Sequence, residues 1–174
     1  MTFSLYAATI PNFCQTLGAV GGLVAKAEAY CAEKGLAPAD LIQARLAPDM
    51  WPFADQIKST IWHSIGAIKG VRKGVFSPEV AVPAPDTFAG LRTWVADSLA
   101  ALEKLDAAEV NGFVGRDMRF EFAGRGMDFT AEDYLLSFAQ PNFYFHAATA
   151  YDILRVKGLP LGKKDFMGRL RRKA

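Results

Sequence analysis

The chain has 174 residues, 51% of them hydrophobic and 22% charged, with a formal net charge of +2. This composition excludes an intrinsically disordered chain, which needs low hydrophobicity and high net charge, and favours a globular domain. The longest weakly polar stretch, residues 18–25, is much shorter than the ~20 apolar residues that a membrane-spanning helix requires. Because the first residues show no basic segment and no cleavage signal, we expect a cytoplasmic protein with no membrane partner.

The charge is unevenly distributed along the chain. From Arg155 onward there are eight basic residues and one acid, a net of +7, whereas the preceding 154 residues carry a net charge of −5. We interpret residues 1–174 as a single helical-bundle domain that ends in a basic tail, residues 159–174. Such a tail can contact nucleic acid or anionic lipid, but the body has no basic stripe that would extend the contact. We therefore predict a solvated tail and no nucleic-acid partner.

The first long helix is predicted over residues 12–34. Pro11 suits the first turn of a helix, with Thr9 or Ile10 just outside it. No further proline interrupts the run, and Gly35 is a favoured residue for ending a helix. Apolar residues recur at steps of three and four, which indicates one buried face.

A second long helix is predicted to begin near Pro52. Three glycines follow at intervals of four residues, Gly66, Gly70 and Gly74. They mark either a close packing seam or a frayed helix end. Because basic residues lie between them, we favour fraying into a loop.

The third long helix is expected to begin after a cap at Asp86 or Thr87 and to end near Leu105. Residues 106–115 are expected to form a turn and a loop. In residues 116–129 the apolar spacing changes to strict alternation around an Ala-Gly-Arg-Gly turn, which predicts a β-hairpin.

The last long helix is predicted to begin after Thr130 and to run to about Lys157. Pro141 lies inside it and should kink it near residues 137–140. The predicted fold class is therefore mainly α, a four-helix bundle with a small β-hairpin between the third and fourth long helices.

One polar cluster is the candidate site. Asn142 and His146 lie four residues apart on the last helix, so their side chains emerge on one face. On the second helix, Gln56 and His63 are seven residues apart. Their heights differ by ~10 Å, so we expect at most one of them to be level with His146.

The last helix carries a family resemblance. Its Pro-Asn-Phe-Tyr-Phe-His segment and the following run from His146 to Gly168 resemble the DinB/YfiT-like superfamily. The likeness is strongest to a bacterial branch of that superfamily without an assigned function. It extends more weakly to Trp51-Pro-Phe-Ala-Asp-Gln-Ile on the second helix and covers most of the chain. Metal-binding members hold a divalent ion with one histidine from the second helix and a His-x-x-x-His pair from the last.

The resemblance implies a degenerate metal site in this chain. His146 matches the second histidine of the pair, Asn142 stands at the first, and the second-helix position is Gln56 or His63. An amide is a much weaker ligand than imidazole for zinc or a similar ion. A retained zinc or nickel ion would rest on His146 and His63, or would need an acid such as Asp55.

Two functions remain open at this point, and no catalytic residue is assigned. The favoured one is a small-ligand-binding or non-catalytic bundle that has lost the full metal triad and holds no cofactor, with a homodimer as one candidate assembly. Its ligand site would comprise Gln56, Asn142, His146 and Tyr144, with walls from Phe143, Phe145 and Trp62. The alternative is a metal-dependent enzyme, a thiol S-transferase or a hydrolase, that uses His146.

Overall fold

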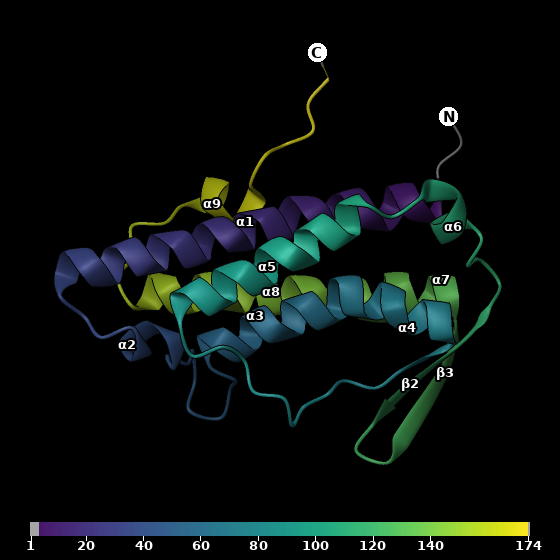
Figure 1. Cartoon of the computed structure of the whole chain (residues 1–174), viewed down its shortest axis with the longest axis horizontal. Helices are drawn as coiled ribbons and strands as arrows, with labels where there is room; N and C mark the ends of the chain where they lie inside the picture. The colour runs from purple at the N-terminus through teal and green to yellow at the C-terminus, as the bar shows by residue number, and fades with distance from the viewer. Residues whose placement is uncertain (1–3, 174) are drawn as a thin grey trace.

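The computed structural model describes residues 4–173 and contains a bundle of four long helical segments in two layers (Figure 1). The predicted fold class is confirmed. One layer consists of α1 (Leu5–Lys34) and α5 (Phe88–Glu103). The other layer consists of two segments that are each interrupted by a π-helical turn: α3 (Phe53–Ile61), η1 (Trp62–Gly66) and α4 (Ala67–Lys73), then α7 (Ala131–Asp133), η2 (Tyr134–Ala139) and α8 (Gln140–Val156).

The core fills the space between these layers. Large apolar side chains from every long segment meet there with almost no exposed surface, and Tyr134 is buried among them. Phe13 of α1 and Phe143 of α8 pack edge to face across the bundle, with ring centroids 4.9 Å apart. This packing places α3 beside α8, and the candidate residues of both helices therefore lie along one seam.

The predicted hairpin is present and belongs to a three-stranded sheet. Strands β2 (Asp117–Phe122) and β3 (Arg125–Thr130) pair antiparallel around a two-residue turn. Both turn residues, Ala123 and Gly124, have positive φ, as in the tight turns that suit the twist of a hairpin. The additional strand β1 (Val75–Phe76) pairs parallel to β2. Two residues are too few to give a periodic signal in the sequence.

Helix α1 begins earlier than predicted. The Ser4 side chain accepts a hydrogen bond from the Ala7 backbone N–H and caps the helix, so Pro11 lies inside it. A proline within a helix removes one backbone hydrogen bond. In the turn next to Pro11, the Ala8 carbonyl accepts from the side-chain amides of Asn12 and Gln140, at 2.8 and 2.6 Å. The C-terminal end is as predicted, because Gly35 closes the helix in the left-handed conformation.

The prediction that the glycine-containing end of the second helix frays is wrong. Helix α4 continues to Lys73, and Gly74 ends it with φ of +76°. The chain then turns back, so that Phe76 packs directly on the helix. A Cβ atom added at Gly70 would lie 2.5 Å from the Phe76 Cβ atom. Gly66 and Gly70 therefore form the close packing seam that was the less favoured interpretation, and Gly74 ends the helix.

Three short helices connect or cover the long ones: α2 (Ala39–Ile42), α6 (Ala107–Asn111) and α9 (Lys163–Met167). Helix α6 lies where only a turn and a loop were expected. Asp106 caps it by accepting from two backbone N–H groups.

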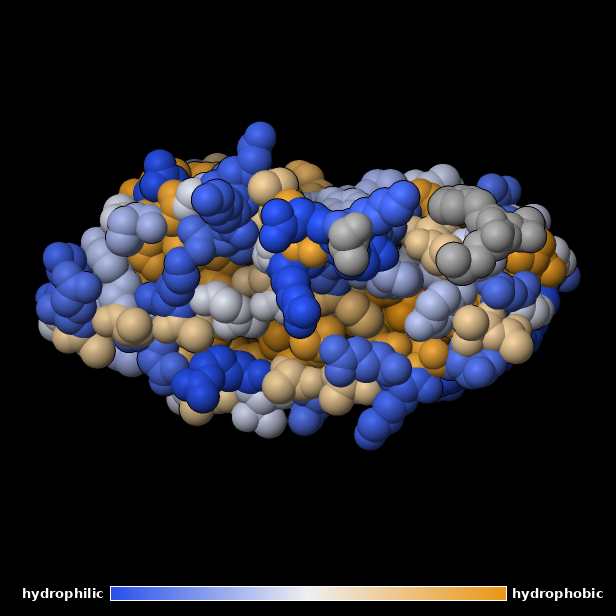
Figure 2. All heavy atoms as spheres, turned by 90° about the horizontal axis from the view of Figure 1, so that it is seen from above, coloured by the Kyte–Doolittle hydropathy of each residue, from blue (hydrophilic) through white to orange (hydrophobic). Residues whose placement is uncertain are grey.

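The C-terminal tail packs on the body over part of its length, contrary to a fully solvated tail. Leu159 and Leu161 are buried, and Asp165 forms an ion pair with Lys26 of α1. Seen from the side of α1, hydrophilic side chains lie across a band of hydrophobic surface (Figure 2). Within residues 4–173, no helix is both long and apolar enough to span a membrane.

The glycine seam can be tested by substitution. Gly70→Ala should lower the free energy of unfolding by about 1–3 kcal/mol, because the added methyl group overlaps Phe76. Gly22→Ala is the matched control, since an added Cβ there meets no atom within 4 Å. It should raise stability by about 0.5–1 kcal/mol through helix propensity alone. Urea unfolding curves measure both, and equal stabilities for the two variants would contradict the seam.

Candidate functional site

A cavity of about 490 Å³ opens where the second and last helices meet the hairpin. Its volume lies within the range of small-molecule sites, about 300–1,000 Å³. All four residues of the predicted polar cluster, Gln56, His63, Asn142 and His146, line it. Its other lining residues come from the segment before α3, from η1, from the β1–α5 connection, from the hairpin and from η2–α8: Asp49, Met50, Trp51, Trp62, Pro78, Phe120, Phe122, Met127, Phe138 and Phe145.

A hydrogen-bond chain joins the two helices within this cavity. The Gln56 side-chain amide donates to the Trp51 carbonyl at 2.9 Å. Its oxygen therefore faces His146, whose Nδ1 lies 2.7 Å away. An amide oxygen only accepts, so this geometry assigns the proton to Nδ1 of His146. Nε2 then carries the lone pair of the neutral ring.

Three aromatic rings lie in parallel along the cavity. The Trp51 ring stacks on His146 with centroids 5.7 Å apart and planes 12° apart. The His63 ring also stacks on His146, with centroids 5.8 Å apart and planes 7° apart. Both second-helix candidates thus contact His146, Gln56 by a hydrogen bond and His63 by its ring. Both contacts are made although the two positions differ in height by ~10 Å along the helix.

Both π-helical turns carry residues of the cavity. η1 contains Trp62 and His63, and η2 contains Phe138. A π turn includes one residue more than an α-helical turn and is frequent at functional sites. Pro141 lacks the N–H that would close an α-helical turn on Ser137, which accounts for the irregularity predicted near residues 137–140. No sequence signal indicated η1.

Asn142 and Tyr144 differ in their relation to the cavity. Asn142 borders the cavity, but its amide donates to the Phe138 carbonyl of its own helix at 2.8 Å and has no hydrogen bond to His146. Tyr144 does not line the cavity, and its ring packs edge-on against Phe143. Phe143 is itself fully buried in the core. Of the predicted walls, Phe145 and Trp62 border the cavity.

Sequence reasoning missed most of the apolar wall. Trp51 attracted notice only through the family resemblance, and the hairpin was not placed against a particular helix. The alternation over residues 117–122 did indicate that the hairpin has one apolar face. That face is divided in the structure: Met118 and Phe120 are buried, whereas Phe122 stays 44% exposed at the cavity.

Burial keeps both imidazoles neutral. Desolvation lowers the pKa of His146 to about 4. Desolvation, followed by the repulsion of a charged His146, lowers the pKa of His63 to about 3. The Nδ1 atom of His63 is also buried without a hydrogen-bond partner among the described residues. The cavity therefore presents two uncharged rings near neutral pH.

The donor set does not fit a three-ligand transition-metal site. Across residues 4–173, no three His, Cys, Asp or Glu side chains are grouped so as to hold an ion. His146 has already committed Nδ1 to Gln56, and the Asn142 amide is turned into its own helix. Asp55, considered as a substitute ligand, instead pairs with Lys58 at 3.4 Å.

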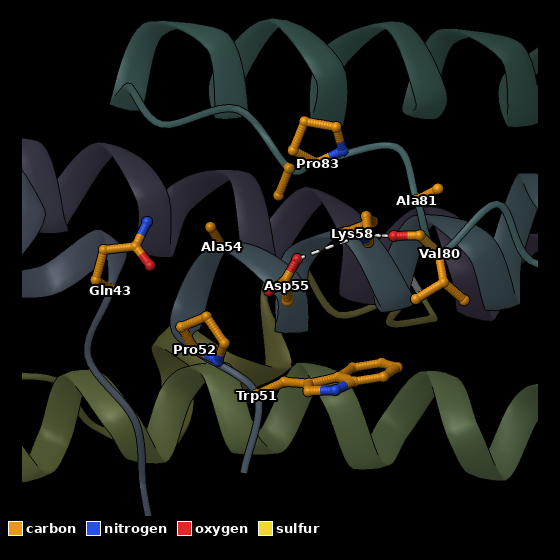
Figure 3. A pocket seen from close by; sticks show the side chains of 10 residues that line it. Gln43, Trp51, Pro52, Ala54, Asp55, Lys58, Val80, Ala81 and Pro83 are labelled. Carbon is orange, nitrogen blue, oxygen red and sulfur yellow. Dashed lines mark hydrogen bonds and ion pairs between the residues drawn. The ribbon is translucent and has the colours of Figure 1, made fainter. Parts of the chain in front are cut away.

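That ion pair belongs to a second hollow of about 360 Å³, which shares Trp51 with the cavity (Figure 3). Lys58 is only 4% exposed. Its ammonium donates to the Val82 carbonyl at 2.8 Å and to that of Val80 at 3.5 Å, and lies 4.7 Å from the Trp62 ring centroid. Lys58 thereby fastens the connection between β1 and α5, which supplies Pro78 to the cavity.

Comparison with known proteins places the chain in a family. The sequence profile described as "Domain of unknown function (DUF1993)" matches residues 5–167. The chain belongs to the DUF1993 family. No curated protein matches it.

Two solved structures resemble this DUF1993 protein. A DinB family member from Shewanella denitrificans is 29% identical, with a TM-score of 0.80, over 98% of this chain and 95% of the other. A DinB-like protein of Bacillus subtilis, YjoA, is 17% identical, with a TM-score of 0.57, over 92% of this chain and 98% of the other, and shows the fold alone. The predicted relationship to an uncharacterised DinB-like branch is confirmed.

The two histidines of this DUF1993 protein should make its stability depend on pH. The unfolded chain binds a proton on each ring below the ordinary pKa of ~6.5, whereas the folded chain does so only near pH 4 and pH 3. Stability is therefore complete above about pH 7 and should fall by about 2 kcal/mol per histidine on acidification to pH 5. The chain has only these two histidines. Urea unfolding of His63→Gln and His146→Gln should each show a smaller decrease than the parent protein, and an unchanged decrease would refute the assignment.

Proposed function

We propose that this protein binds a small organic molecule in the cavity around His146 and acts without a resident metal. The observation that carries the proposal is the hydrogen bond between Gln56 and His146 inside an aromatic-walled cavity. Sites for small molecules combine mainly apolar walls with a few fixed polar groups. The Gln56 amide fixes the orientation of His146, so the binding surface is largely formed before the ligand arrives.

Exposed apolar side chains at the rim support the same proposal. Phe145 is 56% exposed, Met127 and Phe122 are each 44% exposed, and Trp51 is 39% exposed. All four line the one cavity. Grouped exposure of large apolar side chains typically marks a binding surface, because it costs solvation free energy that a ligand recovers.

Titration with Nile red, an uncharged dye whose emission rises in apolar surroundings, tests the proposal. Phe145→Ser should weaken binding about tenfold, because it removes apolar contact area worth about 1–2 kcal/mol. Val156→Ser is the control, since Val156 is 71% exposed on the same helix and does not line the cavity. Equal binding by both variants would place the dye elsewhere and contradict the proposal.

The competing proposal is a metal-dependent enzyme in which His146 Nε2 and His63 hold a zinc or nickel ion. The proximity of the two neutral rings favours it, but it needs a further ligand that the described residues do not group with them. Elemental analysis of untagged protein purified without chelators separates the two. We expect substoichiometric metal that His146→Ala does not change. One equivalent that disappears in His146→Ala would favour the enzyme.

A further inference from the structure

We propose that the cavity selects an uncharged, planar aromatic molecule that carries an N–H or O–H donor, and that Nε2 of His146 accepts this hydrogen bond. This inference rests on the proposed function, because it specifies the class of ligand for the same cavity. It follows from three properties of the lining: an available acceptor, parallel ring faces and the lack of a cationic partner.

The acceptor is defined by the hydrogen-bond chain. The Trp51 carbonyl orients the Gln56 amide, and the Gln56 oxygen accepts from Nδ1 of His146. Nε2 is left as an acceptor with no hydrogen-bond partner among the described residues. A ligand donor would complete the ring's hydrogen bonding. His63 contributes a second unpartnered nitrogen, Nδ1, on a side chain that is only 7% exposed and also lines the cavity. Buried polar atoms are nearly always paired in complete sites.

The ring faces favour a flat molecule. The planes of the Trp51 and His146 rings are 12° apart, and those of the His146 and His63 rings are 7° apart. Phe138 meets His63 edge to face with centroids 5.8 Å apart and adds a wall from the last helix. Aromatic rings recognise one another by offset stacking and by edge-to-face contact, both of which this set offers. A planar ligand can use these faces, whereas a branched aliphatic one cannot.

The charge distribution disfavours ions. The described residues that line the cavity include no Lys and no Arg, and Asp49 is the one charged residue among them. Burying a carboxylate or a phosphate without a cationic partner is costly. A cation would be attracted by the aromatic faces, but Asp49 is exposed at the edge and does not lie buried beside them.

Four matched probes test the class by isothermal titration calorimetry on the full chain. Indole is planar and uncharged with one N–H, 1-methylindole lacks that hydrogen, indole-3-acetate adds a negative charge, and tryptamine adds a positive one. We expect indole to bind about tenfold more tightly than 1-methylindole, as one buried hydrogen bond implies. The two charged probes should bind more weakly than indole.

The variant His146→Asn tests the acceptor itself. The asparagine amide can still donate to Gln56 from the position of Nδ1, but it places no atom at Nε2. The preference for indole over 1-methylindole should fall from about tenfold to about one, because both probes lose the contact with the imidazole ring but only indole loses a hydrogen bond. Tyr144→Phe, on the same helix but outside the cavity, should leave the preference unchanged, and thermal melting confirms that both variants are folded.

The outcomes separate this inference from the proposed function. Equal binding of indole and 1-methylindole by the parent protein, or an unchanged preference in His146→Asn, would overturn the role of Nε2. Tightest binding by tryptamine would indicate a cation site, and tightest binding by indole-3-acetate an anion site, and either would overturn the uncharged class. If none of the four probes binds while Nile red still binds in a Phe145-dependent manner, the ligand class is wrong and the binding cavity stands. If Nile red also fails, both proposals fall.

Discussion

The candidate site depends on the hydrogen bond between Gln56 of α3 and His146 of α8. It joins the two helices that form one layer of the bundle, and both side chains are almost completely buried. Neither partner can be removed without leaving a buried polar group unpaired, which costs about 1–3 kcal/mol. The same bond selects the tautomer of His146 and holds its ring parallel to Trp51. This one hydrogen bond therefore contributes to the stability of the fold and also sets the chemical character of the cavity.

Much of the fold could be predicted because its signals are local. The start of α3 after Pro52, the Thr87 and Thr130 caps, the Gly35 stop and the alternation in the hairpin each depend on neighbouring residues. The errors arose where a distant contact decided the outcome. From the sequence, Gly70 was interpreted as a helix breaker, but Phe76 packs on it in the structure. Pro11 was interpreted as a helix start, but Ser4 caps the helix earlier.

The candidate site, like the fold, could be predicted only in part. Spacing on two helices indicated Gln56, His63 and His146, because residues on one helix face remain neighbours in any bundle. The sequence could not show that the Asn142 amide turns back to Phe138, nor that Tyr144 faces away from the cavity. The walls come from segments more than fifty residues apart, the part before α3 and the hairpin, and their meeting depends on the register of β1 with β2. A two-residue strand carries too little pattern to fix that register.

The cavity is built on two π turns, so regular α-helical geometry at these positions would not place the same side chains at the site. Each turn accommodates one residue beyond the α-helical count, and each residue of an α-helix corresponds to a rotation of about 100°. Deleting one residue from η1 would restore the regular backbone ladder but would turn the following face of α4 away from its partners. The extra residue in η1 thus accompanies the placement of Trp62 and His63 at the cavity. In related chains, the length of this helix, counted from Pro52 to Gly74, would record whether the cavity has been kept.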